Sequence, residues 1–231
     1  MGNYIYPKLN NFLGIKKLKP KELFEIIAGG ESSTVEFKRK TTKYEKIAKE
    51  IVAMANTKGG YLIIGVDDDG TIYGIESEKS ETEIIQQTCL FYIEPPIEPN
   101  IQIVNLNKKD ILVLKIESSN KKPHRVINDD KNVKEYPKAY IRVGEKSIEA
   151  SREMTRFLKS LTDERPLKIG IGENEKRLFE FIERNGRATV KDFARIVNIS
   201  TRRAERIMIK LVRAGVLQIH NDSSSDYFTL V

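Results

Sequence analysis

The sequence of 231 residues is 39% hydrophobic and 32% charged and carries a net charge of +7, which is typical of a folded globular protein and excludes wholesale disorder. No apolar run approaches the roughly 20 residues that cross a bilayer, so no membrane contact is expected, and the single cysteine, Cys89, excludes an internal disulfide and is typical of a cytoplasmic protein. Because there are only two histidines besides, a zinc site is not expected, and any bound metal would have oxygen ligands.

Apolar spacing predicts two kinds of element before residue 162. Helical spacing occurs in four segments: 20–28, 43–56, 80–93 with Ser80 as its cap, and 151–161. Strand-like patterns occur at 34–38, 61–67, 71–75, 101–118 and 138–143, with tight turns at 68–70 and 108–110 that predict two hairpins. This order predicts an α+β domain over 20–161, with a mixed sheet and flanking helices, after an N-terminal arm over 1–19.

The last third of the chain predicts a second, smaller domain. After a linker at 162–172, helical segments occupy 173–184, 189–197 and 200–214, and two short strands flank the polar tip "HNDSSSD". Three helices followed by a two-stranded wing are typical of a winged helix-turn-helix. We therefore expect such a domain over residues 173–231.

The third of these helices has a basic face. Its inward stripe comprises Ala204, Ile207, Met208 and Leu211, and its cations are Arg202, Arg203, Arg206, Lys210 and Arg213. In a DNA reader this face would enter the major groove, with the early residues nearest the base edges. The alternative is a solvated face on a module that binds a protein or forms a dimer.

The positive charge is concentrated at the two ends of the chain. Residues 1–30 have a surplus of three positive charges and residues 164–231 a surplus of four, whereas residues 31–163 are neutral. Basic flanks favour a polyanion partner, DNA or structured RNA, because neutralising phosphates drives binding. The alternative is that the charge serves solubility alone.

The stretch "ESSTVEFKRK" contains carboxylates suited to a metal site. Strand alternation puts Glu36 and Lys38 on one face, whereas Glu31 has to reach that face from the preceding turn and Asp67 ends an apolar strand. Two or three such carboxylates are suited to hold Mg²⁺ or Mn²⁺. The metal would activate a water against a phosphodiester, while Lys38 neutralises a phosphate oxygen. The alternative is the polar face of an exposed strand.

Four motifs in order, "ESSTVEFKR", "IVAMANTKGGYLIIGVDDDGTIYGI", "KPHRV" and "YIRVGEKS", make residues 20–160 resemble the Schlafen AlbA-type domain. The resemblance implies an α+β nucleic-acid-binding domain, and many prokaryotic members are DNA-binding regulators with an appended winged helix. In the nucleolytic members, which cut structured RNA such as transfer RNA, a Glu-x4-Glu pair and a later Asp hold the metal; these match Glu31, Glu36 and Asp67, or its neighbour Asp68. Those members enclose RNA between two lobes, so a chain with one lobe would need to form a homodimer.

Further cations are expected to contact nucleic acid. They are Lys121, Lys122, His124 and Arg125 in a polar loop, and Arg142, which shares a strand face with Tyr140. The alternatives are a solvated loop and a packed tyrosine, and Cys89 is interpreted as an inert core residue.

These observations predict a nucleic-acid-binding protein. The first hypothesis is a DNA-binding regulator, and the second is an endoribonuclease that depends on Mg²⁺ or Mn²⁺. The second predicts that Glu36→Gln abolishes cleavage with little effect on folding.

Overall fold

The computed structural model describes residues 17–127, 136–163, 167, 169–222 and 225–231, so residues 1–16 of the predicted arm lie outside the described residues. The helices are α1 (Pro20–Ala28), α2 (Tyr44–Asn56), α3 (Glu78–Phe91), α4 (Arg152–Leu161), α5 (Glu173–Asn185), α6 (Val190–Val197) and α7 (Thr201–Arg213). The strands are β1 (Val35–Lys38), β2 (Gly59–Ile64), β3 (Ile93–Glu94), β4 (Asn100–Leu106), β5 (Lys109–Glu117), β6 (Arg125–Val126), β7 (Tyr140–Val143), β8 (Lys146–Glu149), β9 (Leu217–His220) and β10 (Tyr227–Leu230).

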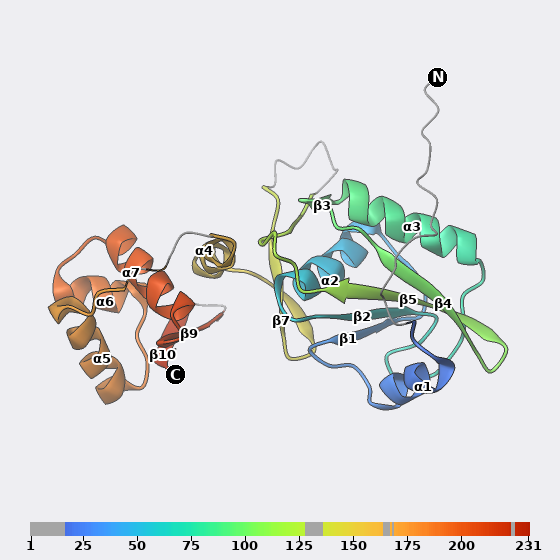
Figure 1. Cartoon of the computed structure of the whole chain (residues 1–231), viewed down its shortest axis with the longest axis horizontal. Coiled ribbons are helices and arrows are strands. Elements are labelled where there is room, and N and C mark those ends of the chain that lie inside the picture. The colour runs from blue at the N-terminus through green and yellow to red at the C-terminus, as the bar shows by residue number, and fades with distance from the viewer. Residues whose placement is uncertain (1–16, 128–135, 164–166, 168, 223–224) are drawn as a thin grey trace, which may run out of the picture.

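The first part of the chain forms a four-stranded sheet with helices on both faces (Figure 1). The strand order is β1-β2-β5-β4, with β1 parallel to β2 and the other pairs antiparallel. Along β2, Leu62 and Ile64 join a core with α2 and α3, whereas Ile63 joins a second core with α1. The α+β class with a mixed sheet is confirmed, and β2 is buried on both faces as its apolar run predicts.

Two local predictions are wrong. The segment 71–75 does not form a strand against β2, and only an isolated bridge joins Val66 to Ile72. The turn between them is present, but β2 pairs with β1 on one side and with the nine-residue β5 on the other, so its hydrogen-bonding edges are already occupied. The cap of α3 is Ser77, whose hydroxyl accepts from the backbone N–H of Ser80.

Gly59 and Gly60 allow the chain to enter β2 between two neighbouring strands. Both have positive φ, +76° and +153°, which favours glycine. A Cβ on Gly60 would lie 2.2 Å from the carbonyl oxygen of Thr34, and one on Gly59 would lie 2.4 Å from that of Ile116. The two glycines therefore permit the close backbone approach on which the pairing of β2 depends.

The side chain of Gln102 in β4 contacts the segment that precedes α1. The side-chain amide of Gln102 accepts from the backbone N–H of Leu18 at 2.9 Å and donates to the Leu18 carbonyl at 2.7 Å. Helix α1 itself also packs against β4. The chain is thereby fixed to the last strand of the sheet before α1 begins.

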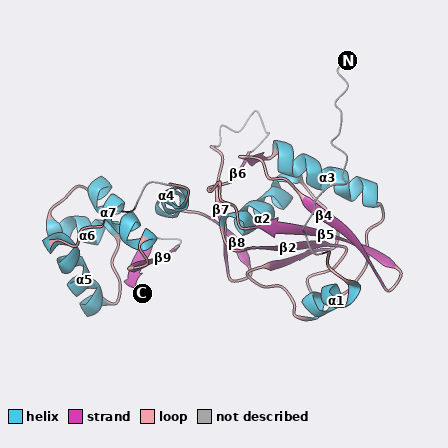
Figure 2. Cartoon of the chain, in the orientation of Figure 1, coloured by secondary structure: helices cyan, strands magenta, loops and turns pink. Residues whose placement is uncertain are grey.

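Helix α4 contacts both parts of the chain and lies between the sheet and the C-terminal helices (Figure 2). Its Met154 and Leu158 pack with Ile141 of β7, and Ile219 of β9 joins the same cluster. The backbone N–H of Ser151, its cap, donates to the side-chain Oδ1 of Asn221 at 3.0 Å. The Ser151 hydroxyl donates to a carboxylate oxygen of Asp226, so the β9–β10 hairpin is hydrogen-bonded to the start of α4.

The C-terminal unit, α5 to β10, contains the three helices and the hairpin that the sequence predicts. Its core includes Leu178, Phe193, Met208 and Phe228. Ala188 extends the hairpin by exchanging two backbone hydrogen bonds with Phe228, at 3.0 and 2.8 Å. Within the described ranges, no helix is long and apolar enough to cross a membrane.

Candidate functional site

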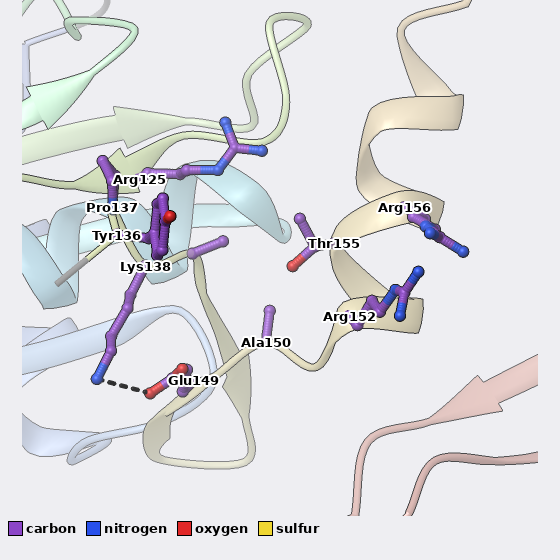
Figure 3. Close-up of a pocket in the computed structure, with 10 residues that line it drawn as sticks. Arg125, Tyr136, Pro137, Lys138, Glu149, Ala150, Arg152, Thr155 and Arg156 are labelled. Atoms are coloured by element: carbon purple, nitrogen blue, oxygen red, sulfur yellow. Dashed lines mark ion pairs between the residues drawn. The ribbon is translucent and has the colours of Figure 1, made fainter.

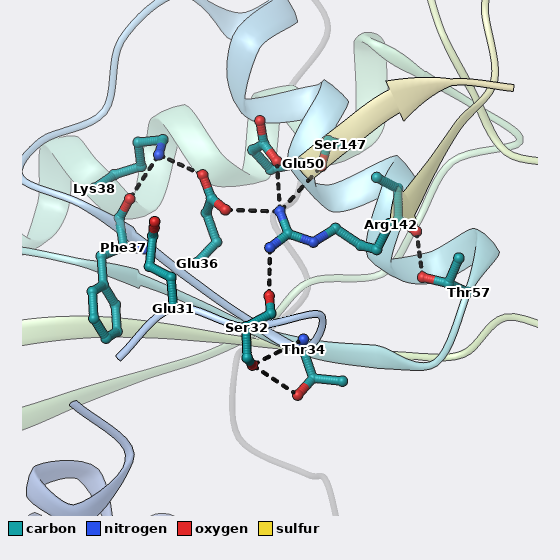
Figure 4. Close-up of polar contacts among 11 residues, drawn as sticks. Glu31, Ser32, Thr34, Glu36, Phe37, Lys38, Glu50, Thr57, Arg142 and Ser147 are labelled. Carbon is teal, nitrogen blue, oxygen red and sulfur yellow. Dashed lines mark hydrogen bonds and ion pairs between the residues drawn. The ribbon is translucent and has the colours of Figure 1, made fainter. Parts of the chain in front are cut away.

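Strand β1 and strand β7 bring opposite charges together at one end of the sheet (Figure 4). Lys38 Nζ lies 2.5 Å from Glu36 Oε1, which confirms that these two side chains share a face. Arg142 Nη1 lies 2.7 Å from Glu36 Oε2 and 3.2 Å from Glu50 Oε2 on α2. Glu36 therefore has a cation against each of its two carboxylate oxygens.

The same arginine holds two further groups. Its Nη2 donates to the carbonyl oxygen of Ser32 at 2.6 Å, and its Nη1 also lies 3.2 Å from the Ser147 hydroxyl, which donates to Glu50. We call Glu36, Lys38, Glu50, Arg142 and Ser147 the charged cluster. The Arg142 side chain is 1% exposed, so the expectation that it contacts nucleic acid is wrong: its guanidinium is buried and engaged within the fold.

Lys38 stays charged in this setting. Burial pulls its pKa down, but the hydrogen bond to Glu36 and the charges of Glu36, Glu31 and Glu50 outweigh burial, so the pKa lies above its ordinary value. A permanently charged lysine compensates the carboxylates around it. Lys38 is half-buried and already paired with Glu36, so little of its charge is available to neutralise the phosphate of a ligand.

Glu31 reaches the cluster from the turn before β1, as predicted. Its Oε1 accepts the backbone N–H of Phe37 at 2.8 Å. Burial raises the pKa of Glu31, the bond from Phe37 opposes that shift, and the negative charges of Glu36 and Asp68 raise it further. The acidic neighbour that acts on Glu31 from beyond β2 is therefore Asp68. Asp67 instead accepts the backbone N–H of Asp68 within the turn.

These carboxylates do not fit a divalent metal in this arrangement. Among the residues that the structure describes, no three His, Cys, Asp or Glu side chains lie close enough to hold a metal ion. The predicted metal site of Glu31, Glu36 and Asp67 is therefore not formed among these residues, although Glu31 lies near enough to Glu36 and to Asp68, the alternative third ligand, for their charges to raise its pKa. The physical reason is that Lys38 and Arg142 occupy the oxygens of Glu36 and supply the positive charge that Mg²⁺ or Mn²⁺ would bring, so no catalytic step is derived through a metal.

The predicted phosphate-contact loop divides into structural and exposed residues. His124 is 2% exposed, with its ring nitrogens 2.6 Å from the Pro95 carbonyl and 2.6 Å from the Ser119 hydroxyl. Lys122 donates to the carbonyl of Thr57 at 3.0 Å, and burial lowers its pKa. His124 and Lys122 thus hold the loop in place, and burial is also the main cause that lowers the pKa of His124. Lys121 is exposed and Arg125 is half-buried, so both face solvent at least in part.

Helix α7 presents the other concentration of charge. Its cations Arg202, Arg203, Arg206 and Lys210 are all exposed, while Ala204, Met208 and Leu211 are buried as predicted. Arg213, expected on the same face, lies 3.9 Å from a carboxylate oxygen of Asp163. The sequence did not reveal that Glu205 and Ile209 are buried too. Helix α4, which packs against α7 and pairs with Glu205, is separated from α7 in the chain by the linker, α5 and α6.

A cleft of about 570 Å³ lies between α4 and the segment leading into β7 (Figure 3). Arg125, Tyr136 and Thr155 line it, and Lys138 pairs with Glu149 at 3.5 Å. Tyr136 is 90% exposed. In Figure 3, Arg152 and Arg156 extend from the side of α4 that lies away from Thr155. Sequence reasoning missed both arginines, although their spacing of four residues marks one face of a helix.

Comparison with known families matches residues 31–151 to the family model described as Schlafen, AlbA_2. Among solved structures, the chain is similar to the N-terminal domain of a protein from Nitrosomonas europaea that is described as related to the ATP-dependent DNA helicase RecG, with 21% identity over 55% of this chain and 90% of that chain and a TM-score of 0.42. It is also similar to the DIP2311 protein from Corynebacterium diphtheriae, with 20% identity over 69% of this chain and 30% of that chain and a TM-score of 0.44. The family match contains the whole charged cluster and ends before the C-terminal unit.

Proposed function

Because this chain belongs to the Schlafen AlbA_2 family, we propose that it is a DNA-binding regulator and that its C-terminal unit is a winged helix-turn-helix. In this proposal α7 enters the major groove of duplex DNA. The AlbA-type domain, residues 20–161, is connected to the C-terminal unit by the linker at 162–172. The observation that carries the proposal is the exposed basic face of α7: Arg202, Arg203, Arg206 and Lys210.

The local structure around α7 supports its use as a recognition helix. Asn198, at φ +54°, ends α6 in the left-handed region, and the Ser200 hydroxyl caps α7 by accepting the backbone N–H of Arg203. The two helices pack through Phe193, Ala204 and Met208. A short turn between two packed helices keeps the second helix rigid, and rigid presentation lowers the entropy lost on binding.

The AlbA-type domain has a supporting role in this proposal. Lys121 and Arg125 are its exposed or half-buried loop cations and remain candidates for backbone contact, whereas Arg142, His124 and Lys122 maintain the fold. Nuclease activity is not part of the proposal, because the carboxylates around Glu36 are compensated by cations. Homodimer formation and RNA binding stay predictions from the family resemblance.

The test is duplex DNA binding by the full chain, measured by fluorescence anisotropy across a salt series. Arg202→Ala with Arg206→Ala should weaken binding by at least about tenfold, since base or phosphate contacts by arginine each contribute about 1–3 kcal/mol. The matched control is Arg177→Ala with Arg184→Ala, which removes two exposed cations from α5. It should bind nearly as the parent does.

Equal affinity in the α7 variant and the parent would make the C-terminal unit a dimerisation or protein-binding module. A parallel titration with transfer RNA separates the two polyanions. If the α7 variant weakens the binding of transfer RNA but leaves the binding of duplex DNA unchanged, DNA is not the ligand of this face. Affinity for the true ligand should fall steeply with salt, as counterion release requires.

A further inference from the structure

We propose that α4 extends the DNA-binding surface of α7, with Arg152 contacting the phosphate backbone beside the groove that α7 enters. This inference rests on the proposed function and adds a contact from outside the C-terminal unit. We call Arg152, Arg156 and Arg202 the arginine ridge. Two of its members belong to α4 and one to the start of α7.

The geometry of α4 directs its arginines toward α7. Arg152 and Arg156 lie one turn apart, whereas Met154 and Leu158 on the buried side pack toward β7. Figure 3 shows the two guanidinium groups on the side of α4 that lies away from Thr155. Both arginines also line the cleft of about 570 Å³.

Direct contacts join this side of α4 to α7. Arg156 forms an ion pair with Glu205, which is 5% exposed. A separate depression of about 220 Å³ is lined by the exposed cations Arg152, Lys191 and Arg202 and by the carboxylates of Glu153, Glu205 and Asp226. Glu205 and Asp226 are buried and already bonded to Arg156 and to Ser151, whereas the three cations face solvent. Arg152 and Arg202 are both exposed, so a ligand that reaches the start of α7 also meets Arg152.

The electrostatics of the ridge favour an anionic ligand. Burial lowers the pKa of Arg156, and the positive charges of Arg152 and Arg202 lower it further, while Glu153 acts in the opposite direction. Arg156 has Glu205 as its partner, but neither Arg152 nor Arg202 has an ion pair with any described residue. Like charges held side by side repel each other, and a phosphate placed between them removes that repulsion.

The ridge is also held in place before any ligand arrives. Asn221 and Asp226 of the hairpin region bond to Ser151, the residue directly before Arg152. Arg213 at the end of α7 pairs with Asp163, just after α4. Because α4 is fixed at both ends, Arg152 keeps a constant position relative to α7. Contacts that are preorganised in this way lose less entropy on binding to the duplex.

The experiment compares Arg152→Gln with the parent full chain in the same anisotropy salt series on duplex DNA. Loss of one phosphate contact should reduce the slope of log K against log salt by about 0.9 and weaken binding by about three- to tenfold at low salt. Arg177→Gln on α5 is the matched control and should leave both the slope and the affinity unchanged. Thermal melting should be the same for all three proteins, because Arg152 and Arg177 are exposed.

The outcomes distinguish a failure of the α4 contact from a failure of the proposed function on which it rests. If the parent binds no duplex, or if the α7 double variant binds as tightly as the parent, the proposed function fails. If the parent binds and the α7 variant weakens, but Arg152→Gln keeps the parent's slope and affinity, the α4 contact alone is overturned. Equal losses in Arg152→Gln and Arg177→Gln would show a general charge effect and would also overturn it.

Discussion

Arg142 and Arg202 are both arginines, but one is buried and the other is exposed to solvent. The Arg142 side chain is 1% exposed and binds two carboxylates and a backbone carbonyl, whereas Arg202 lies exposed at the start of α7. Both were predicted to contact nucleic acid. The comparison shows that carboxylate partners engage the charge of Arg142, whereas the charge of Arg202 faces solvent and is available to a ligand.

The energetic consequences of the two settings differ in kind. Burying Arg142 is tolerated because Glu36 and Glu50 compensate its charge, so removing the arginine leaves two buried carboxylates without their shared cation. An exposed arginine on α7 contributes little to folding, but its charge is available to displace counterions from DNA. Variants should therefore separate into those that change stability and those that change binding.

The largest effect is expected from Arg142→Met. The change leaves Glu36 and Glu50 buried without their shared cation, which should lower the free energy of unfolding by about 3–5 kcal/mol. Urea unfolding followed by circular dichroism measures this loss. Arg203→Met on α7 is the control and should stay within about 0.5 kcal/mol of the parent. Equal stability in both variants would remove the distinction between the two regions.

A smaller loss is expected from Glu36→Gln. The sequence led us to expect little change in folding, but Glu36 accepts from Lys38 on one oxygen and from Arg142 on the other. A glutamine has one acceptor oxygen and presents an N–H₂ group to the second cation, so we expect a loss of about 1–3 kcal/mol. Duplex binding by α7 should stay unchanged in the folded variant. Lost stability together with lost binding would mean that the two regions are coupled.

The smallest effect concerns pH and the contact between the hairpin and α4. Burial raises the pKa of Asp226 above its ordinary value of 3.8, the hydrogen bond from Ser151 opposes that shift, and the charge of Glu153 adds to it. The folded state therefore holds this proton more tightly than the unfolded state does. Its stabilising contribution is complete below pH 3.8 and is lost as pH rises through the raised value.

This direction of the change in stability is tested by the melting temperatures of the parent and of Asp226→Asn, measured from below the ordinary pKa of aspartate to above the raised pKa of Asp226. The parent should lose stability relative to the variant as pH rises, because the neutral amide does not titrate. A difference in melting temperature that stays constant with pH would show that Asp226 has the same pKa in the folded and the unfolded state.

Local patterns in the sequence predicted much of the fold. Alternation placed Glu36 beside Lys38, and helical spacing located the four helices that the structure describes before residue 162. The pairing of Arg142 with Glu36 spans 106 residues and depends on how β7 packs against α2, which no local spacing encodes. The sequence therefore showed the carboxylates suited to a metal but not the second cation that occupies Glu36, because Arg142 comes from a distant strand.

The contact between Gln102 and Leu18 has a consequence for how copies of this protein meet one another. Leu18 packs against the core that α1 forms with β4, which includes Leu23 and Val104. The side chain of Gln102 projects from a face of the sheet, so its two hydrogen bonds to Leu18 hold the chain entering α1 over this core. Losing the Gln102 contact would therefore free Leu18 and uncover apolar side chains, and exposed apolar surface promotes association between copies.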